Sequence, residues 1–311
     1  MRKGDDQSLL SLVIPLYREA SHFAESIKEI IAILDGISMR YELVLIDDGS
    51  PDNTWEVIQQ QRAQFPQIKA ARLSRNFGKE AALAAGLEHV SGDAVVVMDG
   101  DLQHPPQLIP QMVEQWREGA EVVEAVKRSR ATESASARLS SRMFYVMFSR
   151  LTGFDLHGAS DYKLMDRRVV DAWRGMGERN LFFRGMNAWL GFRRVQIQYD
   201  VDERAGGESG WSKLQLIRLA MTAFASFSSA PLYLLIGAGF AFAILAVILG
   251  AQTLFHKLTG NAVDGFTTVI LLLLILGCVS MLGMGLIGIY VARIYEEVKQ
   301  RPRYVIAEWK A

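Results

Sequence analysis

The sequence predicts an α/β domain with a mostly parallel sheet, followed by a membrane-associated helical region. Short apolar runs alternate with amphipathic helical stretches over roughly the first two-thirds of the 311 residues. Strands that alternate with helices are typical of a parallel sheet covered on both faces. Two long stretches near the C-terminal end then carry no charge, and each exceeds the roughly 20 residues that a helix needs to cross a bilayer. We therefore place the α/β domain in residues 1–210 and the membrane region after it.

Composition excludes several functional classes. The 34 basic residues balance the 34 acidic residues, so bulk charge does not favour a nucleic-acid partner. Cys278 is the single cysteine, which excludes an intramolecular disulfide. The first eight residues are polar, and the first apolar run, residues 9–17, is short and interrupted by Pro15. This is not the pattern of a secretory signal, so we expect residues 1–210 to stay in the cytoplasm.

The periodicity of apolar residues places the elements in chain order. Proline is expected to end the first strand at Pro15. After the second strand, Ser50 is expected to cap a helix that has Pro51 in its first turn. Helices are expected over residues 23–34, 78–90 and 135–148, and strands over residues 10–14, 41–46, 68–73, 95–98, 122–126 and 195–199.

Two aspartates directly follow the strand of residues 95–98. Asp99 and Asp101 are separated by Gly100, and alternate side chains of an extended chain point the same way, so both can bind one cation. Gly100 would let a ligand approach the backbone. Hard oxygen ligands of this kind suit Mg²⁺ or Mn²⁺ that is held partly by substrate phosphates. The alternative is a polar turn with two solvated acids.

Polar residues also follow the first two strands, in residues 15–19 and at Asp47-Asp48. Ligands of parallel sheets bind beyond the carboxyl ends of the strands. We therefore expect the acidic segments that follow these two strands and the strand of residues 95–98 to lie close together there. Asp48 can accept a hydrogen bond from a base N–H, and Tyr17 offers a flat apolar face, or else it only covers the end of the sheet. Asn76 and Lys79 could equally serve as a helix cap and a surface cation, so they are left out of the predicted site.

Four of these segments resemble, in the same order, the motifs of family-2 GT-A glycosyltransferases. They are residues 13–19, 47–50, 76–79 and 99–106. The resemblance is closest to the polyprenyl-phosphate glycosyltransferases, a group that includes dolichol-phosphate mannose synthase and bacterial bactoprenol glucosyltransferases. It covers nearly the whole chain, although Asp-Gly-Asp replaces the Asp-Ala-Asp common in the group. It implies a Rossmann-like α/β GT-A catalytic domain.

The resemblance also implies a reaction and its residues. A single sugar passes, with inversion, from a nucleotide-sugar to a polyprenyl phosphate. Donor binding is assigned to Pro15, Tyr17, Glu19, Asp48, Asp99, Gly100, Asp101 and Gln103, and the Mg²⁺ or Mn²⁺ site to Asp99, Asp101 and Gln103.

Basic residues further along the chain are candidates for the acceptor phosphate. Lys127 and Arg130 follow the strand of residues 122–126, where a solvated basic loop is an equal alternative. Arg184 precedes a glycine-rich stretch that resembles the family loop with an arginine and a later lysine. Arg204 matches the arginine, but Gly210 stands where many members have lysine, so Lys213 is assigned that place.

Asp161 resembles the third acid that these enzymes place near the acceptor. A phosphate acceptor has a second pKa near 6 and needs no base, so we expect Asp161 to orient groups. Together with Asp101 and Arg204 it forms the predicted catalytic set. Asp166 and Arg167 are expected to pair with each other.

The membrane region divides into four parts. Residues 211–229 are amphipathic and predict an interfacial helix, or alternatively a core helix of the domain. Residues 231–254 and 266–290 predict two spans. The basic tail, residues 291–311, is expected in the cytoplasm and the short connector outside. We thus expect a multi-pass protein of the inner (plasma) membrane with a cytoplasmic catalytic domain. Gly277, Gly283, Gly285 and Gly288 give the second span small faces for packing, and the resemblance implies a homo-tetramer.

UDP-glucose and undecaprenyl phosphate are the first substrates to consider, on resemblance to bacterial members alone. One alternative is a processive polysaccharide synthase, but the sequence lacks the Gln-x-x-Arg-Trp pentapeptide of those enzymes. The other is a non-catalytic membrane scaffold that keeps the fold, against which the intact Asp99, Asp101 and Gln103 argue.

Overall fold

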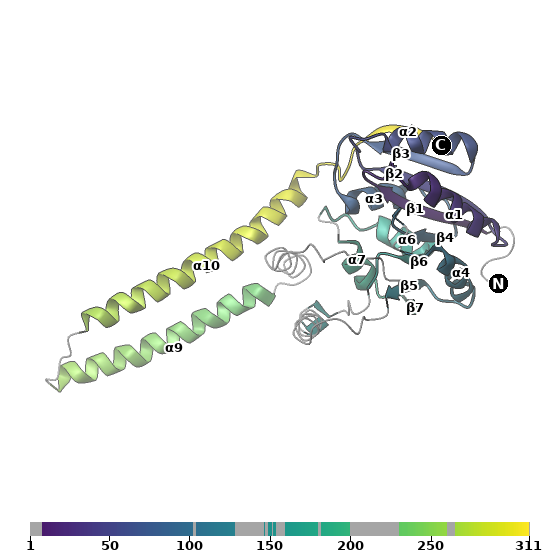
Figure 1. Ribbon diagram of the computed structural model, residues 1–311. Coiled ribbons are helices and arrows are strands. Elements are labelled where there is room, and N and C mark those ends of the chain that lie inside the picture. The colour runs from purple at the N-terminus through teal and green to yellow at the C-terminus, as the bar shows by residue number, and fades with distance from the viewer. Residues whose placement is uncertain are drawn as a thin grey trace. The chain divides into compact units, whose positions relative to one another are not determined.

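The computed structural model describes residues 8–101, 104–127, 146, 149–150, 152–153, 159–179, 182–199, 230–259 and 265–310. The chain forms two units, Met1–Gly210 together with Arg301–Ala311, and Trp211–Gln300 (Figure 1). The strands are β1 (Leu9–Leu16), β2 (Arg40–Asp47), β3 (Ile68–Leu73), β4 (Ala94–Val97), β5 (Val122–Lys127), β6 (Lys163–Asp166), β7 (Arg194–Tyr199) and β8 (Ile306–Lys310). The helices are α1 (Phe23–Asp35), α2 (Thr54–Gln64), α3 (Lys79–His89), the 3-10 turn η1 (Pro106–Leu108), α4 (Ile109–Arg117), α6 (Arg167–Arg174), α7 (Phe183–Trp189), α9 (Ala230–Leu258) and α10 (Phe266–Lys299).

The described strands form one mixed, mostly parallel sheet in the order β7-β5-β6-β4-β1-β2-β3-β8. The strands β4, β1, β2 and β3 pair in parallel, as β5 does with β7. Only β6 and β8 run antiparallel to their neighbours. The carboxyl ends of β1, β2, β4, β5 and β7 therefore meet at one edge of the sheet, where the amino end of β6 also lies. This arrangement confirms the predicted α/β architecture.

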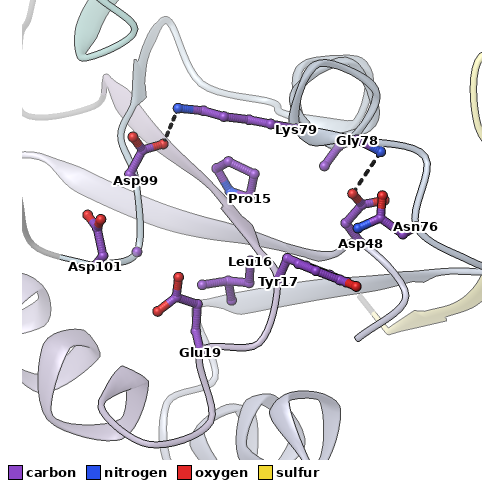
Figure 2. Close-up of a pocket in the computed structure, with 12 residues that line it drawn as sticks. Pro15, Leu16, Tyr17, Glu19, Asp48, Asn76, Gly78, Lys79, Asp99 and Asp101 are labelled. Carbon is purple, nitrogen blue, oxygen red and sulfur yellow. Dashed lines mark hydrogen bonds and ion pairs between the residues drawn. The ribbon is translucent and has the colours of Figure 1, made fainter. Parts of the chain in front are cut away.

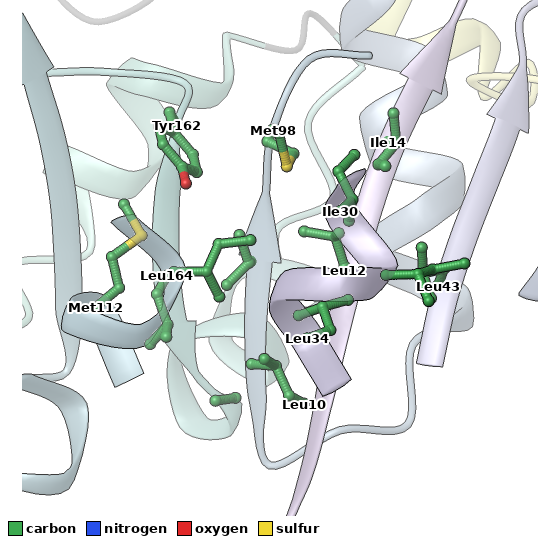
Figure 3. Close-up of a cluster of buried hydrophobic side chains, with 14 of the residues drawn as sticks. Leu10, Leu12, Ile14, Ile30, Leu34, Leu43, Met98, Met112, Tyr162 and Leu164 are labelled. Atoms are coloured by element: carbon green, nitrogen blue, oxygen red, sulfur yellow. The ribbon is translucent and has the colours of Figure 1, made fainter. Parts of the chain in front are cut away.

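Helices cover both faces of the sheet. On one face α1 and α4 bury the alternate side chains of β1, β2 and β4, and Figure 3 shows Ile30 and Leu34 of α1 pointing at Leu10 and Leu12 of β1. On the other face α3 lies so close to β1 that a Cβ at Gly86 would come within 2.3 Å of Val13 Cγ1. Glycine is required there because two elements approach each other without room for a side chain. The close contact fixes α3, whose first turn points at the site.

Proline does not end β1 as predicted. The strand continues to Leu16, and Pro15 is in register with Ile46 of β2. The carbonyl of Val13 accepts from Met98 on the β4 side, and that of Leu16 accepts from Asp48 on the β2 side. Pro15 shares the side of Val13, but β4 ends at Val97, so the missing N–H falls where the neighbouring strand has already ended.

The predicted cap of the second helix is also wrong. Helix α2 begins at Thr54, three residues after Pro51, and Ser50 does not cap it. The Ser50 N–H donates to Asp47 Oδ1 at 3.0 Å, and Ser50 Oγ accepts from the Arg18 N–H at 3.1 Å. Ser50 thus joins the turns after β1 and β2 instead of starting a helix.

The tail after α10 adds a strand that the sequence analysis did not predict. β8 pairs antiparallel with β3, and the Ser74 N–H donates to the carbonyl of Val305. Before it, Arg303 forms an ion pair with Glu88 at 3.7 Å, and the Trp309 ring lies 4.5 Å from that of His89. The residues that follow the helical hairpin therefore belong to the first unit, which contains the sheet.

The second unit contains two apolar helices that run beyond the predicted spans. Leu235–His256 and Ile275–Lys299 are long and apolar enough to cross a membrane, and their side chains are not buried within this chain. Phe240, Val247 and Leu282 are among many large apolar side chains that stay exposed. A Cβ at Gly283 would lie 3.5 Å from Leu235 Cδ2 of the other helix, whereas a Cβ at Gly285 would meet nothing within 4 Å.

Candidate active site

A pocket of about 280 Å³ lies at the carboxyl edge of the sheet (Figure 2). Residues from the ends of β1, β2 and β4 and from the start of α3 line it, which confirms that the three acidic strand exits meet. Figure 2 shows Asp99, Asp101 and Glu19 on one side of the pocket and Asp48 with Tyr17 on the other. The lining residues are Pro15, Leu16, Tyr17, Glu19, Asp48, Asn76, Gly78, Lys79, Ala82, Asp99, Gly100 and Asp101.

The turn after β1 brings two of the predicted donor residues into this pocket. Arg18 has a positive φ of 61°, which is unusual for a residue with a side chain and reverses the chain between Tyr17 and Glu19. The Glu19 N–H donates to Thr54 Oγ1 at 3.0 Å, which fixes the turn. Burial raises the pKa of Glu19, and the charges of Asp101 and Asp99 raise it further.

The two aspartates after β2 have different roles. Asp47 is fully buried, where Oδ1 accepts from the Ser50 N–H and Oδ2 lies 3.3 Å from Arg72 Nε. Asp48 turns toward the pocket, and its two oxygens accept from the N–H groups of Phe77 and Gly78 at 2.7 and 2.8 Å. Each carboxylate oxygen has two lone pairs, so Asp48 keeps the capacity to accept from a base.

Asp99 and Asp101 fit a divalent cation. They follow β4, lie near each other along one side of the pocket in Figure 2, and supply hard oxygens. Within the described ranges no cluster of three or more His, Cys, Asp or Glu side chains forms a metal site. The arrangement suits Mg²⁺ or Mn²⁺, which take few protein ligands when phosphates supply the rest.

A glycine is required at position 100 for a steric reason that was not predicted from the sequence. A Cβ at this position would lie 2.5 Å from Leu16 Cδ2 and 3.4 Å from Ile14 Cγ2. Leu16 is buried, so it has little room to move. The glycine thus lets the Asp99–Asp101 turn pack directly on β1, in addition to lining the pocket.

Lys79 is exposed at the surface, as the sequence suggested, but it lies in the site, and Asn76 is not a helix cap. The Lys79 Nζ lies 2.6 Å from Asp99 Oδ1 and 3.2 Å from Asp161 Oδ2. Burial alone would lower the pKa of Lys79, but the two carboxylates outweigh burial and raise it. The N-cap of α3 is Gly78, and Asn76 lines the pocket instead. The sequence signal that was available is the position of Lys79 just after a strand exit, at a helix start.

A second pocket adjoins the first, since Lys79 and Asp99 line both. It has a volume of about 410 Å³ and contains basic side chains from the carboxyl end of β5 and the start of α7, beside Tyr199 at the carboxyl end of β7. Because β6 runs antiparallel, the segment before it reaches the same edge and brings Asp161 there. The further lining residues are His104, Val126, Lys127, Ala159, Ser160, Arg184 and Tyr199.

Asp161 and Arg184 form a bidentate ion pair in this second pocket. The Arg184 Nε donates to Oδ1 and its NH2 to Oδ2, each at 2.7 Å. Burial alone would raise the pKa of Asp161, but Arg184 and then Lys79 outweigh burial and hold the pKa well below its usual range. A carboxylate with so low a pKa is a poor proton acceptor. Asp99, Lys79, Asp161 and Arg184 thus form a chain of alternating charge, called the ion-pair chain below.

Several predicted residues and helices are not described by the structure, and one predicted ion pair is wrong. Gln103, Arg130, Arg204 and Lys213 lie outside the described residues. The same holds for the helix predicted over residues 211–229 and, except for residue 146, for the helix predicted over residues 135–148. The predicted Asp166–Arg167 pair is wrong. Asp166 caps α6, and its Oδ1 meets Arg168 Nε at 3.2 Å, because the helix turns Arg167 away toward Asp171 at 3.1 Å.

Comparison with known proteins decides the family. The profile described as "Glycosyl transferase family 2" matches residues 11–173, and related proteins match nearly the whole chain. The chain belongs to glycosyltransferase family 2. One relative, "Prophage bactoprenol glucosyl transferase homolog" of Escherichia coli, is 35% identical over 303 residues, 97% of this chain and 99% of its own. Another, "Putative glycosyltransferase CsbB" of Bacillus subtilis, is 38% identical over 304 residues, 97% of this chain and 92% of its own.

Solved structures show that this glycosyltransferase has the GT-A fold. Mannosyl-3-phosphoglycerate synthase from Rubrobacter xylanophilus matches with a TM-score of 0.51 at 18% identity, over 70% of this chain and 73% of its own. A mannosyltransferase from Pyrobaculum calidifontis, in complex with GDP-Man and Mn²⁺, matches with a TM-score of 0.50 at 17% identity, over 89% of this chain and 87% of its own.

Proposed function

We propose that this glycosyltransferase transfers one sugar from a nucleotide-sugar to a polyprenyl phosphate, with inversion, at the cytoplasmic face of the membrane. The observation that carries the proposal is the pair of adjoining pockets, one rich in carboxylates and one in cations, on a unit that continues into two apolar helices. Relatives named bactoprenol glucosyl transferases, 34–35% identical over nearly the full length, support a lipid acceptor.

In this proposal the first pocket holds the donor. Tyr17 and Asp48 face the base, with Pro15 and Glu19 beside them. Asp99, Asp101 and Gln103 hold Mg²⁺ or Mn²⁺, which neutralises charge on the pyrophosphate leaving group when bound. UDP-glucose is the first donor to test, since the names of the relatives specify a glucosyl group.

The second pocket then receives the acceptor phosphate. Lys127 and Arg184 line it, and Arg130, Arg204 and Lys213 are proposed to complete it from segments outside the described residues. The phosphate carries about −1.5 to −2 charges near neutral pH, so it attacks without losing a proton to a base. Asp161 accordingly orients Arg184 and Lys79, in keeping with its lowered pKa.

The experiment is a transfer assay with the purified full-length protein. Labelled nucleotide-sugars are incubated with undecaprenyl phosphate, and the lipid product is separated and sized. We expect one sugar per lipid, formed only when lipid phosphate is present. A polymeric product would favour a processive synthase. Absence of any product with every donor would overturn the proposal and leave a non-catalytic scaffold.

Topology follows from the last strand. Because β8 pairs with β3, the chain after α10 returns to the catalytic unit, so an even number of crossings must separate the two ends of the hairpin. Arg301, Arg303 and Lys310 give this side the positive charge of a cytoplasmic face. We predict that a cysteine at Asn261 reacts with a membrane-impermeant reagent in intact cells.

The matched control is a cysteine at Lys310, in a Cys278→Ala background. It is exposed on β8 and should react only after the membrane is opened. Labelling of Lys310→Cys in intact cells, with Asn261→Cys protected, would contradict the proposed orientation.

A further inference from the structure

Glu80 is a titratable side chain beside the site that the proposed transfer does not use. It follows Lys79 in the first turn of α3, and it is not among the residues that line either described pocket. Its Oε2 accepts a hydrogen bond from the Phe183 N–H at 2.8 Å. Phe183 is the first residue of α7, whose own N-cap residue supplies no side-chain cap. Glu80 thus caps α7 from a different helix.

The start of α7 decides where Arg184 points. Phe183 is buried, packs edge-on against Trp173 at 6.4 Å, and has Lys163 Nζ above its ring at 5.0 Å. Arg184 is the next residue and makes the bidentate bond to Asp161. Arg184 directly follows Phe183 in the chain, so a contact that fixes the backbone of Phe183 also fixes the point from which the Arg184 side chain extends. Glu80 therefore acts on Arg184 through the backbone of Phe183.

The charge of Glu80 goes beyond what capping requires. Lys79 on its own helix, Asp161 before β6 and Arg184 on α7 surround it. The pKa of Glu80 is raised to about 7, mainly by burial and also by the charge of Asp161, against the lowering effects of the Phe183 N–H, Lys79 and Arg184.

This shift has a defined sign. A carboxyl whose pKa is higher in the folded than in the unfolded state favours folding most at low pH, and this contribution is lost as pH rises through the folded pKa. The ionised form of Glu80 is therefore a cost to stability above about pH 7. A glutamine would accept the same hydrogen bond without that cost, so the carboxylate charge has a role other than stability.

We propose that Glu80 is a positioning residue for the acceptor: its ionised carboxylate fixes the start of α7 and so holds Arg184 in place for the acceptor phosphate, and its protonation loosens that anchor. The inference rests on the proposed function, in which Arg184 faces the acceptor. A hydrogen bond to a charged acceptor is roughly twice as strong as a neutral one, so the anchor weakens as pH falls.

The test compares Glu80→Gln with the wild type. The KM for undecaprenyl phosphate is measured at saturating donor between about pH 6 and about pH 8.5, on both sides of the Glu80 pKa. We expect Glu80→Gln to raise this KM about fivefold at the alkaline end, as the loss of a charge-assisted bond implies. The ratio of the two KM values should fall toward one at the acid end, where wild-type Glu80 is itself neutral.

Taking a ratio removes the titration of the lipid phosphate, which is common to both proteins. Glu56→Gln is the matched control, because Glu56 is also a first-turn glutamate, on α2, but is exposed and lines neither pocket. It should leave the KM unchanged at every pH.

Hydrogen exchange gives a readout that does not depend on transfer. In Glu80→Ala the backbone amides of residues 182–190 should exchange faster than in the wild type, while binding of the nucleotide stays unchanged. A KM ratio that is independent of pH, or equal protection of these amides in Glu80→Ala, would overturn the inference. If the wild type transfers no sugar to lipid phosphate, the proposed function fails, and exchange still tests the anchor.

Discussion

The two pockets of the site are built by different interactions. In the first pocket, called the donor pocket after its proposed ligand, backbone N–H groups hold a polar side chain: Phe77 and Gly78 donate to Asp48. In the acceptor pocket, charged side chains hold one another in the ion-pair chain. A carboxylate fixed by amides keeps its place when a ligand enters, whereas an ion-pair chain must exchange partners with a charged ligand.

This difference predicts how each pocket responds to binding. The donor pocket is preformed, so donor affinity should depend little on the acceptor side. In the acceptor pocket Lys79 already neutralises Asp99, so a cation at Asp99 and Asp101 would compete with Lys79 and shift it toward Asp161 or a phosphate. The predictions below separate the two behaviours.

The largest effect is expected where the donor pocket meets the metal. Asp101→Asn should reduce transfer at least a thousandfold, about 4 kcal/mol on the tenfold scale, because it removes one of two carboxylates that fit the cation. Transfer by the wild type should require Mg²⁺ or Mn²⁺ and stop with a chelator. The measurement is the transfer rate with and without EDTA.

Asp171→Asn is a suitable control, since Asp171 lies on α6, half-exposed and away from both pockets. It should keep full activity. Undiminished turnover of the wild type in excess EDTA would exclude the metal, whatever Asp101→Asn does.

An intermediate effect is expected in the ion-pair chain. Arg184→Ala should raise the KM for lipid phosphate about tenfold or more, and Arg184→Lys should restore only part, because lysine cannot bind Asp161 or a phosphate bidentately. Donor affinity should not change. Arg40→Ala, at the opposite edge of the sheet, is the control.

The measurement is a lipid titration at saturating donor beside direct nucleotide binding. A loss of donor affinity in Arg184→Ala would show that the two pockets are coupled, and the contrast between them would no longer hold.

The same contrast explains what could be predicted from sequence. The residues of the donor pocket belong to short continuous motifs that directly follow strands. The periodicity of apolar residues and the residue types of turns locate such motifs without any knowledge of distant contacts. Asp48, Tyr17 and Asp99 were found this way, and all line the pocket. The family resemblance, not spacing, pointed to Asp161, because its position depends on the antiparallel strand β6, which was not predicted.

Lys79 was missed for a related reason. Its partners are 20 residues away at Asp99 and 82 residues away at Asp161, and no local pattern distinguishes a lysine that meets them from a solvated one. β8 was missed because its short sequence follows a long helix, and only the free edge of β3 makes it a strand. Pairing with a distant strand decided both elements, β6 and β8, against local propensity.

The smallest of the three effects is expected at Asp48, where the contrast is tested most directly. Asp48→Asn keeps the size of the side chain, but Phe77 and Gly78 donate to different oxygens of Asp48, and an asparagine in the same position presents an oxygen to only one of them. One N–H then faces an amide N–H₂, which costs about 1–3 kcal/mol. The loop should rearrange, and donor affinity should fall about tenfold, as about 1.4 kcal/mol implies.

Nucleotide binding and the lipid KM must both be measured to interpret this variant. Asp93→Asn is the matched control, because Asp93 also accepts from a backbone N–H, that of Leu9, but lies at the opposite edge of the sheet and does not line the pocket. If the contrast holds, Asp48→Asn weakens the donor and spares the KM for lipid phosphate, since the amides that hold Asp48 lie outside the ion-pair chain. A raised lipid KM with unchanged donor affinity would mean that this loop acts through Lys79, one residue after Gly78, and that the ion-pair chain depends on the donor pocket.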